Sequence, residues 1–154
     1  MIRTRKLIDR FLAIALIVTM TVLVIDVVWQ VLARYIVKSP SSFTDELARF
    51  LLIWVGLLGS AYAMGKKKHL AIDILPSKLT GRSRILLDNF ISILIIAFAA
   101  LVLVIGGIRL VYITLNLNQV SPALGVPLGY VYLVLPFSGL LIMFYGLYDI
   151  LVKE

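Results

Sequence analysis

Phe43-Thr-Asp-Glu-Leu-Ala-Arg-Phe50, an uncharged run that continues to Gly65, and then Lys66-Lys67-Lys68-His69 form the most informative stretch of this chain. The run has the length of a membrane span, and basic residues at one end are typical of the cytoplasmic side. A helix that begins near Thr44 places Asp45, Glu46 and Arg49 within one turn of each other, where water gives way to lipid. Charges at that depth need partners. The stretch therefore predicts a transmembrane helix with a polar group at its outer end.

The composition extends this prediction to the whole chain. Apolar residues make up 62% of it and the mean hydropathy is +1.06, whereas soluble domains are about 45–50% apolar. A span needs ~20 residues, so 154 residues accommodate four spans and leave little for a soluble domain. We therefore predict an all-α integral membrane protein that forms a single membrane domain over residues 1–154. Its transmembrane helices are expected at about residues 7–33, 44–64, 85–112 and 128–152.

The basic residues indicate the orientation. The formal charge is +7, and most Lys and Arg residues precede the first span or lie between the second and third. This bias predicts cytoplasmic N- and C-termini, so we attribute the surplus to topology and not to nucleic-acid binding. The apolar segment 70–75 is too short to cross and is expected along the cytoplasmic membrane surface. Contact with lipid headgroups is expected for basic residues around this segment: Lys66, Lys67, Lys68, Arg82 and Arg84.

The sequence offers little for catalysis. It contains no Cys, which excludes disulfides, thiolate catalysis and Cys-ligated metal, and its single His excludes a haem held between two imidazoles of this chain. No metal-binding His-Glu motif, phosphate-binding Gly loop or nucleophile elbow is present. We therefore expect a protein that is not an enzyme and that holds no cofactor or metal.

A polar stripe runs along the first span. Asp26, Gln30 and Arg34 follow each other at steps of four residues, which places them on one helix face that rises toward the outer surface. One interpretation is a self-satisfied ladder, in which Arg34 reaches the interface and pairs back through Gln30 to Asp26. The other is contact with a partner helix, or a proton path. Asp26 lies nearer the outer face than the bilayer centre, which favours structure or partner packing.

The second span has a face of small residues. Gly56, Gly59 and Ser60 recur at helical spacing, and small side chains permit close helix approach in lipid. We expect this face to be buried against another helix. Trp54 lies near mid-span, away from an aromatic belt, which favours packing against protein. Helix capping explains the acids that follow Thr44 equally well, but it does not explain Arg49 one turn deeper.

The last outer loop and the last span carry turn and bend signals. No charge occurs between Leu110 and Tyr148, so we expect the loop to be partly covered by protein, with turns set by Pro122, Gly125 and Pro127. Pro136 predicts a bend in the span. The same span has Gly139 and Gly146 on one side, a pattern that favours close packing. Tyr145 and Tyr148 are expected at the inner membrane interface.

Three segments resemble one transporter family. Residues 43–63, the basic-His-aliphatic segment 68–75 and residues 121–132 are similar to the small membrane subunit of tripartite ATP-independent periplasmic (TRAP) transporters. The resemblance covers nearly the whole chain. It implies a non-enzymatic, multi-pass subunit of the bacterial inner membrane that binds a large multi-span membrane subunit. In this family the two form a sodium-coupled importer of organic acids, such as C4-dicarboxylates or sialic acid, fed by a periplasmic binding protein.

The resemblance also suggests which residues meet those partners. Asp45, Glu46 and Arg49 take the place of the family's acid-acid-base motif, and we hypothesise that they pair with the large subunit or with each other. The expected partner-binding set, toward the large subunit or the binding protein, is completed by Trp54, Gly56, Gly59, Ser60, Asp26, Gln30, Arg34, Gly125 and Pro127. The alternative is a small four-span homodimeric efflux transporter driven by protons, for which Asp26 is the sole candidate carboxylate.

Overall fold

The computed structural model describes residues 2–37, 41–66 and 82–151, and at residues 2–4, 37, 82–86 and 88 it describes the backbone only. Most of the described chain is helical. The elements are α1 (Ile2–Leu32), η1 (Ala33–Val37), α2 (Ser42–Gly65), α3 (Arg82–Phe98), η3 (Ala99–Gly106), α4 (Gly107–Asn116), α5 (Leu128–Tyr132) and α6 (Val134–Leu151), where η1 and η3 are π-helical.

Four of the resulting rods are long and apolar enough to cross a membrane. They cover Arg5–Ile36, Ser42–Gly65, Asn89–Asn116 and Leu128–Leu151, which confirms the predicted all-α membrane protein with four spans. The third ends later than expected because α4 stays helical to Asn116. The orientation of the termini remains a prediction, and the surface segment 70–75 lies outside the described residues.

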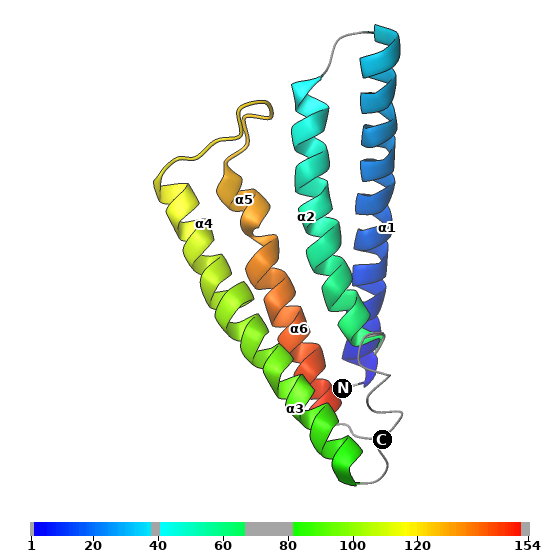
Figure 1. The fold of residues 1–154 in the computed structure, drawn as a ribbon, viewed down its shortest axis with the longest axis vertical. Coiled ribbons are helices and arrows are strands. Elements are labelled where there is room, and N and C mark those ends of the chain that lie inside the picture. Colours follow the sequence, from blue (N-terminus) through cyan, green and yellow to red (C-terminus); the bar gives the residue numbers. More distant parts are fainter. Residues whose placement is uncertain (1, 38–40, 67–81, 152–154) are drawn as a thin grey trace.

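The rods form two antiparallel hairpins. The first hairpin is α1 with α2, and the second is α3, η3 and α4 packed on α5 and α6, with α2 and α6 in contact between them. Figure 1 shows that the hairpins lie together where α1 begins and α2 and α6 end, and that they diverge toward the opposite end. We call these the closed end and the loop end, because residues 117–127 connect α4 to α5 at the latter. Much of α1 packs on α2 alone, and its other faces expose large apolar side chains.

The second hairpin is held by close helix approach. A Cβ atom at Gly139 would lie 2.8 Å from Cβ of Leu103, and one at Gly146 would lie 2.7 Å from Cγ1 of Ile96. Both distances are shorter than the 3.0 Å below which Cβ atoms essentially never approach other atoms, so α6 approaches η3 and α3 this closely because these positions are glycine. Such approach increases dispersion contact in a bilayer, where apolar burial gives no drive between helices. The predicted packing side of the last span is thus confirmed.

The last span is interrupted close to its proline. α5 ends at Tyr132 and α6 begins at Val134, because Pro136 has no N–H to donate to the Tyr132 carbonyl. The third span behaves differently at its glycines. Gly106 and Gly107 both keep helical φ and ψ, and the departure from α-helix is the π-helical turn η3, which ends at Gly106.

Candidate functional site

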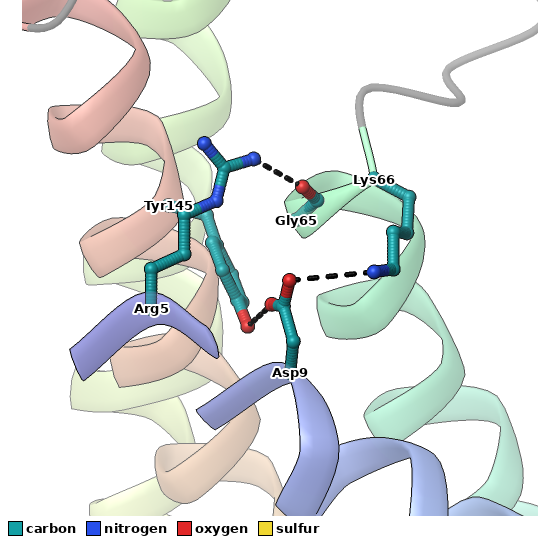
Figure 2. A network of polar contacts seen from close by, with 5 residues as sticks. All are labelled: Arg5, Asp9, Gly65, Lys66 and Tyr145. Atoms are coloured by element: carbon teal, nitrogen blue, oxygen red, sulfur yellow. Dashed lines mark hydrogen bonds and ion pairs between the residues drawn. The ribbon is translucent and has the colours of Figure 1, made fainter. Parts of the chain in front are cut away.

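The closed end is fastened by a polar cluster that joins α1, α2 and α6 (Figure 2). The Tyr145 hydroxyl donates to Oδ1 of Asp9 at 2.5 Å, and Lys66 Nζ lies 3.4 Å from Oδ2 of the same carboxylate. Arg5 donates to the carbonyl oxygen of Gly65 at 2.6 Å, which is one of the last carbonyls of α2. Asp9 therefore binds a side chain from each hairpin with its two oxygens.

Two tyrosines at this end are buried within the bundle. Tyr145 is only 1% exposed and Tyr148 is also buried, with the Arg5 guanidinium 4.7 Å from the centre of the Tyr148 ring. Both rings therefore pack within the bundle, and their place at the inner membrane interface stays a prediction. The Tyr145 ring covers Gly65, where a Cβ atom would lie 2.7 Å from the ring carbon Cζ. The Tyr145 ring can be buried in the bundle because its hydroxyl donates a hydrogen bond to the Asp9 carboxylate.

The loop end is fastened by one carboxylate. Oε2 of Glu46, in the first turns of α2, accepts hydrogen bonds from the backbone N–H groups of Ala123 at 2.8 Å and Leu124 at 3.1 Å. The side chain of Ser121 also hydrogen-bonds Glu46 and is 1% exposed. The predicted acid of α2 thus meets the predicted turn loop within the same chain, although they lie 77 positions apart.

The loop itself is a small hairpin. Val120 pairs with Pro127, and the N–H of Ser121 donates to the Val126 carbonyl at 2.9 Å. Gly125 has φ +67°, a conformation that L side chains rarely adopt, so the expected turn role of Gly125 is confirmed. The partial cover expected for this loop is found at Ser121, whereas Val120 and Val126 are exposed.

A third contact ties the hairpins between the two ends. The indole N–H of Trp54 donates to the carbonyl oxygen of Val131 at 3.1 Å, which links α2 to α5. Trp54 therefore contacts protein as expected, although 37% of it is exposed. Polar ties at Asp9, Trp54 and Glu46 thus occur along one seam between the hairpins.

The polar stripe of α1 is not the self-satisfied ladder that we considered. Asp26 is buried, at 8% exposed, but its Oδ2 has no hydrogen-bond partner among the described residues. Arg34 is exposed in the π-helical turn η1, and Gln30 is half-buried. Asp45 of α2 lies close enough to act electrostatically on Asp26. The ladder is broken because Asp26 is covered within the α1–α2 hairpin, while Arg34 points into the surroundings.

The small-residue face of α2 is not buried by the described part of the chain. Gly56 and Ser60 are exposed, a Cβ at Gly56 would meet nothing within 4 Å, and one at Gly59 would meet only Leu16 at 3.9 Å. The internal contacts of α2 come instead from a neighbouring face that includes Leu58 and Ala61. The expected burial against another helix is therefore not made by the helices that the structure describes.

The remaining sequence expectations concern metal ligands and lipid headgroup contacts. Within the described part of the chain, no three His, Cys, Asp or Glu side chains gather as a metal site would require. Lys66, expected at lipid headgroups, pairs with Asp9. Lys67 and Lys68 lie outside the described residues, as do the side chains of Arg82 and Arg84.

Comparison with known proteins identifies the family. The model of the DctQ component of tripartite ATP-independent periplasmic transporters matches residues 23–153. The chain belongs to this DctQ family. It is therefore a non-catalytic membrane subunit of a TRAP transporter, as the resemblance implied, and the alternative of a self-sufficient efflux protein loses its support. A large membrane subunit is the partner that this family implies.

Named relatives agree with the DctQ assignment. The chain is 29% identical over 85% of its length to a candidate TRAP transporter small permease protein of Haemophilus influenzae, of which it covers 78%. It is 28% identical over 66% of its length to the sialic acid TRAP transporter small permease protein SiaQ of Vibrio cholerae, of which it covers 59%. It is also 30% identical over 80% of its length to the isethionate TRAP transporter permease protein DctMQ of Oleidesulfovibrio alaskensis, of which it covers only 20%.

Proposed function

We propose that this DctQ subunit acts as a fixed scaffold for the large subunit of a TRAP transporter in the bacterial inner membrane. The transporter would take up organic acids, such as C4-dicarboxylates or sialic acid, by sodium symport after delivery by a periplasmic binding protein. The names of its relatives support this substrate class, since they include sialic acid and isethionate transporters. The closed end would face the cytoplasm, in keeping with the basic residues that surround it.

The observation that supports a scaffold is the tied seam between the hairpins. Asp9, Trp54 and Glu46 each connect the first hairpin to the second. Contacts spread along a seam oppose both sliding and opening, because either motion must break several hydrogen bonds where little water is present to replace them. A moving substrate-carrying element in the large subunit needs such a body to move against.

The exposed stripe of α2 is the surface that we propose for the large subunit. Arg49, Leu52, Gly56 and Ser60 recur at helical spacing and are all exposed. No ion pair within 4.0 Å joins Arg49 to an acid among the described residues, although Glu46, three positions earlier on α2, interacts with it electrostatically. A guanidinium at the lipid boundary is stabilised by a partner carboxylate, and Gly56 leaves room for close helix approach. The other predicted contacts would flank this stripe: Asp45, Trp54 and Gly59 on α2, Asp26, Gln30 and Arg34 on the first rod, and Gly125 and Pro127 in the loop.

Copurification of the two subunits tests this surface. We expect Arg49→Leu and Gly56→Leu each to reduce recovery of the large subunit with the tagged small one, by about tenfold if one good interfacial contact of about 1.4 kcal/mol is lost. Arg109→Leu is the matched control, because Arg109 is another exposed arginine but lies on α4. Undiminished complex recovery and unchanged uptake in proteoliposomes for both α2 variants would refute the proposed surface. Sodium-driven uptake by the small subunit alone would refute the scaffold role.

A further inference from the structure

The two acids of the 43–50 motif have different surroundings. Asp45 lies close enough to act on Asp26 of the first rod, whereas Glu46 turns to the loop of the second hairpin. We propose that Glu46 is a positioning residue that holds residues 119–128 on α2, and that it does not contact the large subunit. This inference refines the proposed function, since it divides one motif into a contact part at Arg49 and an internal latch at Glu46.

The geometry of the latch is that of a carboxylate bound by a prepared turn. The N–H of Leu124 donates both to Oε2 of Glu46 and to the hydroxyl oxygen of Ser121, at 3.1 and 3.2 Å. The N–H of Gly125 donates to the Ser121 carbonyl at 2.9 Å, and this closes the turn behind them. The N–H groups of Ala123 and Leu124 consequently point at one place, which Glu46 occupies. Successive N–H groups in a turn form an anion-binding concavity of this kind.

Glu46 is the side-chain acceptor found for the Ala123 N–H among the described residues, and it shares the Leu124 N–H with the Ser121 hydroxyl. Without Glu46, the N–H groups of Ala123 and Leu124 would lose this acceptor at the membrane boundary, where water replaces it poorly. Glu46 is also the acceptor that joins the loop to α2, since the hydrogen bonds described at Ser121, Gly125 and Leu128 otherwise stay within the loop. Charge-assisted hydrogen bonds are about twice as strong as neutral ones. The loop position therefore depends on one carboxylate.

Hydrogen exchange of the loop tests this inference. In the copurified complex in nanodiscs, we expect Glu46→Ala to speed amide exchange of a peptide covering residues 119–128 by about 10- to 100-fold, as loss of charged hydrogen bonds implies. Glu46→Gln retains one carbonyl acceptor, so its exchange should be intermediate. Asp45→Asn is the matched control from the same helical turn and should leave the exchange of this peptide unchanged.

Copurification of the large subunit distinguishes the proposed role of Glu46 in holding the loop from the proposed contact surface at Arg49. We expect Glu46→Gln to copurify the large subunit as the parent does, while its loop exchanges faster. Loop exchange equal to the parent in both Glu46 variants would overturn the latch, and so would loss of the complex in Glu46→Gln with a protected loop. Failure of Arg49→Leu to reduce complex recovery would refute the proposed surface but leave the latch intact. Ser121→Ala offers a second route if Glu46→Ala does not fold, and we expect it also to speed loop exchange.

Discussion

The closed end and the loop end of this protein join the same two hairpins in different ways. At the closed end, a buried aromatic ring packs on a glycine, and its hydroxyl reaches a carboxylate that also pairs with a lysine. At the loop end, a carboxylate at the start of α2 holds two backbone N–H groups of a small loop hairpin. The first junction therefore combines packing with hydrogen bonds, and the second relies chiefly on hydrogen bonds.

This difference assigns the stability of the chain chiefly to the closed end and the recognition of other subunits to the loop end. Removing a residue from the closed end leaves a cavity or a buried unpaired group, and both are costly. The loop end leaves Arg34 and Arg49 exposed and Asp26 without a partner at Oδ2 among the described residues. Ionisable groups that are exposed to lipid or buried without a partner cost free energy in a membrane, unless a neighbouring protein or a lipid headgroup supplies a partner. The closed end thus holds the chain together, and the loop end is where we expect other subunits to contribute.

The largest expected effect is at the ring that fills the closed end. Tyr145→Ala should lower the free energy of unfolding by about 3–5 kcal/mol, because it leaves a cavity beside Gly65 and removes the partner of Asp9. Reversible unfolding in mixed micelles, followed by circular dichroism, measures this change. Tyr130→Ala is the control, since Tyr130 is an exposed tyrosine of α5 and should change stability little. Equal losses for the two variants would contradict the assignment of Tyr145 as the central closed-end residue.

A pair of glycine substitutions on α2 sharpens the same comparison. Gly65→Ala should destabilise the chain by about 1–3 kcal/mol, because the new methyl group would meet the Tyr145 ring at 2.7 Å. Gly56→Ala should cost the isolated chain nothing from contact, since nothing lies within 4 Å of its added Cβ. The same unfolding assay compares them. A cost at Gly56 that matches the cost at Gly65 would mean that α2 packs on a different face.

The sequence was sufficient to predict the transmembrane helices and the local turns. Apolar runs of the right length predicted four spans, Pro136 predicted the break before α6, and Gly125 predicted the turn that its positive φ confirms. These features depend on residues close together in the chain, so composition and spacing reveal them. The small-residue pattern was less decisive. Both α2 and α6 carry it, yet among the described residues Gly139 and Gly146 of α6 are tightly packed while Gly56 and Gly59 of α2 are not, because the pattern does not say whether the partner helix is internal.

The ties along the seam were not predictable in the same way. Asp9 and Tyr145 are separated by 136 positions, and nothing near either residue identifies the other. Asp9 resembles an ordinary polar residue near the start of a span, and Tyr145 resembles an interfacial tyrosine. An unpaired acid close to the start of an apolar helix was the one available signal, since a carboxylate there needs a partner. Glu46 gave such a signal, but its partner proved to be the backbone of a loop.

The smallest expected effect lies at the tie between the two ends. Trp54→Phe removes the donor to the Val131 carbonyl while it keeps an aromatic ring, and should lower the free energy of unfolding by about 0.6 kcal/mol, the average for hydrogen bonds between membrane helices. Trp29→Phe is the control, because Trp29 is the other tryptophan and is exposed on α1. If both variants unfold like the parent, Trp54 serves as contact surface and not as a tie. A loss confined to Trp54→Phe would show that the seam is held between its ends as well as at them.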